Sequence, residues 1–249
     1  MANAFYRPGE TRAARVNDLF GAIAHRYDLA NDLQSLGLHR RWKERVAQRA
    51  GVGVGQVVLD VCCGTGDVSF ALARTGARVL GLDFSGPMLE VARGRGRRSA
   101  PQATAGAAPP HGQQPMLFLR GDALHLPFRN GSVDAVTISY GLRNLANVPA
   151  GVVELWRVLR PGGRLVVLDF GKPRNAAWRQ CYFAYLRWFV PVLGRVICGS
   201  SEAYAYILES LIHYPAQSGV EVLIRGLRPQ RCELENLMGG VMSIHCAVK

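Results

Sequence analysis

Glycines and carboxylates with the spacing of a nucleoside-binding site lie in the first third of the chain. Residues 57–61 are apolar apart from Asp60, and they are followed by the segment Cys-Cys-Gly-Thr-Gly-Asp, residues 62–67, which we call the glycine turn. In an open α/β sheet, a turn of this kind after the first strand presents backbone N–H groups to a ligand. A second apolar segment, residues 78–83, ends in Asp83. An acid at the end of that strand can accept hydrogen bonds from both hydroxyls of a ribose.

The charges in the glycine turn distinguish between two nucleoside ligands. Dinucleotide folds favour G-x-G-x-x-G, but Ser69 stands at the third glycine position and Asp67 adds an acid to the turn. An acid disfavours the negative pyrophosphate of NAD, whereas Asp67, or Asp60 at the strand end, suits the sulfonium and ammonium groups of S-adenosylmethionine. We therefore expect S-adenosylmethionine rather than NAD. A turn that only links a strand to a helix is the remaining interpretation.

Apolar strand-like segments alternate with amphipathic helix-like segments from residue 57 to residue 170. This alternation predicts an α/β fold, namely a Rossmann-like, doubly wound and mostly parallel sheet with helical N-terminal and lid additions. The expected strands are residues 57–61, 78–83, 116–120, 132–139 and 164–170. The expected helices are residues 68–74, 85–92 and 148–159, with Ser85 as the N-cap of the second.

The pattern divides the chain into four expected parts. They are an N-terminal helical cap at 1–50, an α/β core at 51–172, a helical lid at 173–221 and C-terminal strands at 222–249 that complete the sheet. In the cap, helical spacing over 16–24 is expected to break at 28–37 and to resume at 42–50. In the core, residues 93–114 are rich in Arg, Gly, Ala and Pro, and they predict a solvated low-complexity insertion.

The lid begins with a long aromatic and apolar segment, residues 176–198. It is not expected to span a membrane, because Arg179, Arg187 and Arg195 interrupt it and Pro191 is expected to break it. The same composition suits a helix that packs on its own domain. It equally suits a lid that faces the membrane interface, with aromatic rings at the acyl boundary and arginines at the head groups.

Composition limits the compartment and the partners. The chain of 249 residues has a formal net charge of +12, and its six cysteines form no C-x-x-C pair and no zinc-like cluster. No apolar leader with a cleavage site is evident, so a cytoplasmic location is expected, with peripheral contact at the inner membrane face as an addition. An arginine-rich ordinary surface and an anionic membrane surface both explain the charge, and we expect no nucleic acid partner and no metal. A homo-oligomer is compatible with the sequence.

Several further segments carry a resemblance to a known family. They are residues 18–28 (DLFGAIAHRYD), 35–42 (SLGLHRRW), 59–67, 121–123 (GDA), 126–128 (LPF), 137–144 (TISYGLRN) and 157–164 (RVLRPGGR). Through these segments, the chain resembles the C-methyltransferases of menaquinone and ubiquinone biosynthesis, which are class I S-adenosylmethionine-dependent methyltransferases. The double cysteine is similar to the phylloquinone branch of that family, and the ending SIHCAVK is similar to the menaquinone branch.

The resemblance implies an activity and a set of site residues. The expected reaction is C-methylation of a prenylated quinol, demethylmenaquinol to menaquinol, with the phylloquinone precursor or the ubiquinone precursor as alternative acceptors. Methylation of RNA and an inactive, methyltransferase-like binding protein are further alternatives. The expected cofactor-binding residues are Asp60, Gly64, Thr65, Gly66, Asp83, Phe84, Asp122, Ala123 and Ser139.

The expected catalytic residues follow the fourth predicted strand. A quinol carbon becomes nucleophilic when a neighbouring hydroxyl loses its proton, so the reaction needs a base or a polarised water. Tyr140, Arg143 and Asn144 are the candidates. Arg143 does not readily deprotonate, so we assign it to stabilising the phenolate or orienting water.

Overall fold

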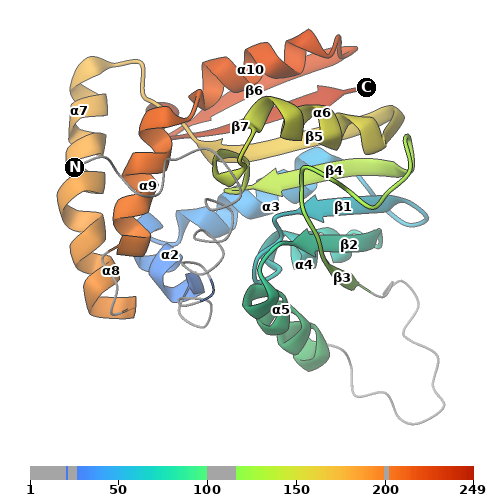
Figure 1. Ribbon diagram of the computed structural model, residues 1–249, viewed down its shortest axis with the longest axis horizontal. Helices are drawn as coiled ribbons and strands as arrows, with labels where there is room; N and C mark the ends of the chain where they lie inside the picture. Colours follow the sequence, from blue (N-terminus) through green and yellow to red (C-terminus); the bar gives the residue numbers. More distant parts are fainter. Residues whose placement is uncertain (1–20, 22–26, 100–115, 199–201) are drawn as a thin grey trace.

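The computed structural model describes residues 21, 27–99, 116–198 and 202–249. These residues form a seven-stranded sheet with the strand order β3-β2-β1-β4-β5-β7-β6. The strands are β1 (Val57–Val61), β2 (Arg78–Asp83), β3 (Leu117–Arg120), β4 (Val133–Ser139), β5 (Leu159–Phe170), β6 (Arg231–Leu237) and β7 (Met242–Val248). The first five run parallel, and β7 pairs antiparallel with β5 and β6. The predicted doubly wound, mostly parallel α/β fold is therefore confirmed (Figure 1).

Helices cover the sheet and gather at one end of it. The α-helices are α2 (Tyr27–Ser35), α3 (Leu38–Ala50), α4 (Asp67–Ala73), α5 (Gly86–Ser99), α6 (Val148–Val158), α7 (Ala176–Ala184), α8 (Val190–Cys198), α9 (Glu202–His213) and α10 (Ala216–Gly226). Figure 1 shows α2, α7, α8 and α9 beyond the end of the sheet at which β1 and β4 terminate. These four helices, which come from the segments expected to form the cap and the lid, thus lie next to the carboxyl ends of the parallel strands, where α/β proteins bind ligands.

The register of the central strands determines which loops meet. β1 and β4 are mostly apolar and lie in the core, as expected for parallel strands covered on both faces. In their ladder Asp60 is opposite Thr137 and Val61 is opposite Ile138. The glycine turn after β1 therefore emerges beside Ser139 and Tyr140 at the end of β4.

The predicted insertion at 93–114 is partly wrong, because α5 continues to Ser99. Two arginines of this segment anchor the helix. Arg93 Nη2 donates to the carbonyl of Phe118 at 2.9 Å, and Arg95 Nη1 donates to the carbonyl of Thr65 at 3.0 Å. Arginine and alanine are good helix formers, and these tertiary contacts offset the helix-weakening glycines between them. Residues 100–114 lie outside the described part of the chain.

The predicted break at 28–37 is also wrong, because α2 occupies Tyr27–Ser35. The Asp32 carboxylate accepts from the Arg40 guanidinium at 2.6 Å and lies 2.8 Å from His39 Nε2, so it ties α2 to α3. The chain turns between the two helices at Gly37, whose φ is +75°. The helix expected at 16–24 lies outside the described residues, except for Gly21, which is helical.

Two boundaries near the C-terminus also differ from expectation. Pro191 does not break the aromatic segment, since a π-helical turn, η2 (Tyr185–Phe189), joins α7 directly to α8. The wider π-helical turn leaves room for the proline ring and does not depend on the backbone N–H that proline lacks. Residues 222–226 belong to α10 rather than to a strand. Among the described residues, no helix combines the length and apolar character needed to cross a bilayer.

Candidate active site

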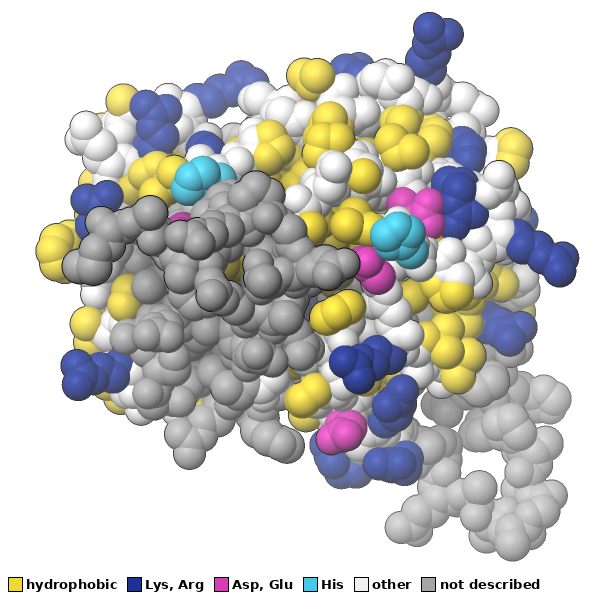
Figure 2. All heavy atoms as spheres, in the orientation of Figure 1, with side chains coloured by type: hydrophobic (Ala, Val, Ile, Leu, Met, Phe, Trp, Pro, Cys, Tyr) yellow, Lys and Arg dark blue, Asp and Glu magenta, His cyan; other side chains and the backbone are white. Residues whose placement is uncertain are grey.

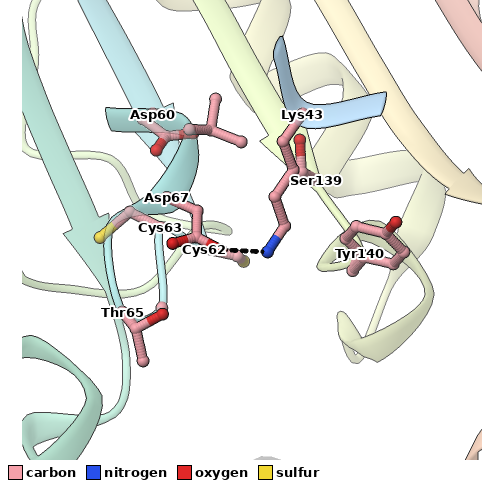
Figure 3. Close-up of a pocket in the computed structure, with 10 residues that line it drawn as sticks. Lys43, Asp60, Cys62, Cys63, Thr65, Asp67, Ser139 and Tyr140 are labelled. Carbon is pink, nitrogen blue, oxygen red and sulfur yellow. Dashed lines mark hydrogen bonds and ion pairs between the residues drawn. The ribbon is translucent and has the colours of Figure 1, made fainter. Parts of the chain in front are cut away.

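The glycine turn, the end of β4 and one side chain of α3 form a pocket of about 340 Å³, open to solvent (Figure 3). Its lining residues are Lys43, Asp60, Cys62, Cys63, Gly64, Thr65, Asp67, Val68, Ser139 and Tyr140. The turn is tightly curled, with φ of +55° at Cys62 and +90° at Gly66. A Cβ at Gly66 would lie 2.9 Å from the ring of Phe70, so only glycine fits there.

Asp83 holds the glycine turn from the end of β2. Its two carboxylate oxygens accept hydrogen bonds from the backbone N–H of Gly64 at 2.7 Å and of Ser85 at 2.8 Å. Burial raises the pKa of Asp83, and the backbone donors partly oppose that rise. The Ser85 hydroxyl has no hydrogen-bond partner among the described residues, so the predicted side-chain N-cap is not formed. The adjacent Phe84 is 44% exposed.

Asp60 is a buried residue of the pocket wall. Its oxygens accept from the Ser69 hydroxyl at 2.6 Å and the Thr137 hydroxyl at 2.8 Å, which connects β1 to α4 and to β4. Burial raises its pKa to about 6, although both hydroxyls oppose the rise. Each oxygen therefore already has one protein donor, and contact of this acid with a ligand cation stays a prediction.

Asp67 is held between two cations. Its Oδ2 accepts from Lys43 Nζ and its Oδ1 from Arg95 Nη2, both at 2.6 Å. Burial alone would raise its pKa, but the two cations outweigh burial and lower the pKa to about 2. The sequence reasoning missed Lys43. The signal was available, because Lys43 is one of only three lysines and directly follows the family segment 35–42.

The end of β4 contributes Ser139 and Tyr140 to the pocket wall. The buried Ser139 Oγ has no hydrogen-bond partner among the described residues, so it can accept or donate to a bound molecule. Tyr140 adopts a left-handed backbone with φ of +61°. Its ring packs edge-to-face on Phe170, with centroids 5.7 Å apart, and lies 5.8 Å from Lys43 Nζ.

Arg143 and Asn144 lie beside the pocket and are not among its lining residues. The side chain of Arg143 is 4% exposed, and its Nη1 donates to Asp169 Oδ1 at 2.9 Å and to the Tyr140 carbonyl at 2.7 Å. The Arg143 backbone N–H donates to the other Asp169 oxygen at 3.0 Å, and the guanidinium stacks 4.4 Å from the Phe170 ring. Asn144 Nδ2 donates to the Tyr140 carbonyl at 3.3 Å. These residues fix the turn that presents Tyr140.

Asp122 and Ala123 follow β3 and are likewise not part of the pocket lining. The Asp122 side chain is 44% exposed. One of its oxygens accepts from the Leu124 N–H at 2.9 Å, and the other lies 3.3 Å from His125 Nδ1. Ala123 is 5% exposed. Their expected role in binding the methyl donor remains a prediction.

The residues of the pocket fit S-adenosylmethionine. The curled glycine turn offers backbone groups and Ser139 brings an unpartnered hydroxyl, whereas Asp83 is not among the lining residues and holds the turn from the end of the second strand. The pocket also holds both an acid and an ammonium, which suits a ligand that carries cationic and anionic groups. These features match the chemistry of a nucleoside with an amino-acid end.

Comparison with known proteins identifies the family. The model of the ubiE/COQ5 methyltransferase family matches residues 9–249. A demethylmenaquinone methyltransferase of Beutenbergia cavernae is 40% identical over 234 residues, covering 94% of this chain and 90% of that protein. A second, of Desulfitobacterium hafniense, is 36% identical over 240 residues, with 95% and 90% covered. The ubiquinone/menaquinone biosynthesis C-methyltransferase UbiE of Cellvibrio japonicus is 34% identical over 245 residues, with 97% and 94% covered.

Solved structures show the same fold at low sequence identity. A SAM-dependent methyltransferase of Aquifex aeolicus aligns with a TM-score of 0.55 at 15% identity, covering 83% of this chain and 89% of that one. The magnesium protoporphyrin IX methyltransferase of Synechocystis, solved with bound SAH, aligns with a TM-score of 0.55 at 18% identity, with 85% and 83% covered.

The matches agree with the pocket geometry and confirm the predicted family, enzyme class and cofactor. The chain belongs to the ubiE/COQ5 methyltransferase family, and it is a methyltransferase whose cofactor is S-adenosylmethionine.

Proposed function

We propose that the protein transfers a methyl group from S-adenosylmethionine to a ring carbon of a prenylated quinol, and that its acceptor is demethylmenaquinol. The observation that carries this proposal is the near full-length similarity, at 36–40% identity, to two proteins named demethylmenaquinone methyltransferase. The benzoquinol precursor of ubiquinone is the second candidate acceptor, because a relative at 34% identity is named for both quinones.

The donor would be held by the glycine turn, by Asp83 at its ribose and by Ser139. When bound, it supplies an electrophilic methyl group on a sulfonium. The protein must then orient the acceptor carbon in line with that group and exclude water from the pocket. Ser139 and Tyr140 stand in the pocket wall, next to the residues expected to hold the donor, and this arrangement supports a role for both in that alignment.

Removing the proton from a quinol hydroxyl raises the electron density at the neighbouring ring carbon. Tyr140 is the predicted catalytic residue that lines the pocket, and the structure supports a positioning role for Arg143 and Asn144 through the Tyr140 carbonyl. Direct contact of Arg143 with the quinolate or with a water stays a prediction. Arg143 is buried and is not among the residues that line the pocket, so such a contact requires its side chain to move.

The surface of the lid supports a peripheral membrane location, which a prenylated acceptor requires. Trp188, Phe189, Val192 and Val196 are 52–77% exposed on η2 and α8. The exposed Arg187 and Arg195 lie on the same helical segment, as expected for a helix at an anionic interface. On the face drawn in Figure 2, some basic side chains lie around the outline and others gather in the lower middle of the view. The expectation of no nucleic acid partner stays a prediction. Cytoplasmic location and oligomeric state remain predictions.

The proposal is tested by incubating the purified protein with S-adenosylmethionine that carries a labelled methyl group. Reduced demethylmenaquinone and the reduced ubiquinone precursor are offered in separate vesicles, and the labelled lipid is identified by mass spectrometry. We expect label in menaquinone. Label only in the benzoquinol product would assign the second acceptor, and label in neither lipid, with the donor bound, would contradict quinol methylation.

A further inference from the structure

A lysine that the assigned site does not include enters the pocket. Lys43 lies on α3, which precedes the first strand of the core, and its side chain is 10% exposed. Its Nζ donates to Asp67 at 2.6 Å and lies 5.8 Å from the centre of the Tyr140 ring. Figure 3 shows the ammonium in the middle of the pocket, between the glycine turn and Tyr140. A buried ammonium that faces a ligand pocket is expected to contact the ligand.

Lys43 belongs to a group of charged side chains that are paired with one another. Lys43 and Arg95 each bind one oxygen of Asp67, and we call these residues the Lys43–Asp67–Arg95 cluster. Because the two cations keep the pKa of Asp67 low, its carboxylate is ionised at neutral pH. Taken alone, the cluster carries two positive charges and one negative charge, and Asp60, which also lines the pocket, is a further carboxyl group close enough to interact with Lys43. An ammonium has three donor hydrogens, so Lys43 can pair with Asp67 and with a ligand oxygen at the same time.

The methyl donor brings one anionic group, the carboxylate of its amino-acid end. We propose that Lys43 binds this carboxylate and thereby sets the orientation of the donor, with its amino-acid end toward α3. The inference rests on the proposed function, because it assumes the donor in this pocket. The ionised acceptor oxygen is the other anion available. The donor carboxylate is favoured because the ammonium is hydrogen-bonded to Asp67 in the glycine turn, where the donor is expected.

The test compares three ligands by calorimetry: S-adenosylhomocysteine, its carboxylate methyl ester and 5′-methylthioadenosine, which lacks the amino-acid end. We expect Lys43→Met to weaken binding of S-adenosylhomocysteine about ten- to hundredfold, as for loss of a charge-assisted hydrogen bond. Binding of the ester and of methylthioadenosine should change less than about twofold, and retained methylthioadenosine binding shows that the variant is folded. Lys43→Arg should retain most of the affinity. Arg41→Met is the matched control, since Arg41 is an exposed cation on the same helix.

Each outcome decides between the interpretations. Equal loss of affinity for all three ligands would show that Lys43 only supports the fold, and no loss would show that the carboxylate lies elsewhere. Unchanged donor binding with a lower kcat for the quinol would assign Lys43 to the acceptor and overturn the inference. In the wild type, the ester should bind more weakly than the free acid, so this comparison does not depend on any variant. Failure of the wild type to bind any of the three would refute the proposed function itself.

Discussion

Replacement of Asp60 by asparagine tests whether burial raises the pKa of this acid in the pocket wall. Asp60 is 1% exposed, and the hydroxyls of Ser69 and Thr137 donate to its two oxygens. Asparagine has the same shape but does not ionise, and both hydroxyls can rotate to pair with a carboxamide. Asp60→Asn should therefore remove the titration of this site without opening a cavity.

The magnitude follows from the pKa. Burial raises the pKa of Asp60 from its ordinary value of 3.8 to about 6, a difference of about 2 units or roughly 3 kcal/mol. Because the folded state binds the proton more tightly, the wild type is at no disadvantage well below pH 3.8, where both states are protonated. The full penalty applies above about pH 6, where Asp60 must ionise while buried. Relative to Asp60→Asn, the wild type should lose stability as the pH rises between these limits.

The assay is urea unfolding followed by tryptophan fluorescence, at intervals from about pH 4.5 to about pH 7.5. The difference in free energy of unfolding, wild type minus Asp60→Asn, should fall by about 2 kcal/mol over this range. Taking the difference removes the contributions of other groups, such as Asp67, whose pKa is lowered. A difference that stays constant with pH, or that rises, would refute a raised pKa at Asp60.

Three further changes have definite expected results. Arg143→Met leaves Asp169 buried without its cation and should lower the free energy of unfolding in urea by about 3–5 kcal/mol. In the double variant with Asp169→Asn, the loss should be smaller than the sum of the losses in the two single variants. Gly141→Ala would place a Cβ 2.4 Å from Cys62 Cβ, so it should reduce the free energy of unfolding by about 1–3 kcal/mol. It should also weaken donor binding measured by calorimetry. Unchanged donor binding would mean that the glycine turn tolerates the shift. Trp188→Ser should reduce flotation with anionic vesicles at low salt. Because Trp188 is 72% exposed, the free energy of unfolding should stay within about 0.5 kcal/mol of the wild type. Equal flotation of both proteins would argue against membrane contact through η2.

Much of the core could be predicted because its signals are local. Predicted residues 57–61 and 78–83 coincide with β1 and β2. A run of apolar residues that ends in a glycine turn is typical of a buried parallel strand, whatever lies elsewhere in the chain. The cofactor was predicted from the acid in the turn, but in the structure Lys43 and Arg95 bind both oxygens of Asp67, so the charge argument behind that prediction is weaker than the sequence suggested.

The errors share a physical cause. The stretch 93–99 looked irregular in sequence but forms the end of α5, since Arg93 and Arg95 bind carbonyl groups of distant segments. Pro191 looked like a break, yet the π-helical turn before it keeps the helix continuous. In both places tertiary contacts or backbone adjustment outweigh local propensity.

By itself, the sequence determined the fold class, the family and the position of the glycine turn, because strand periodicity and turn chemistry act over a few neighbouring residues. Only the tertiary structure decided which charges meet. Lys43 reaches Asp67 because α3 packs on α4, and Arg143 pairs with Asp169 because the end of β4 lies beside β5. These pairs depend on helix packing and strand register between segments 24 and 26 residues apart, and no local pattern encodes either distance.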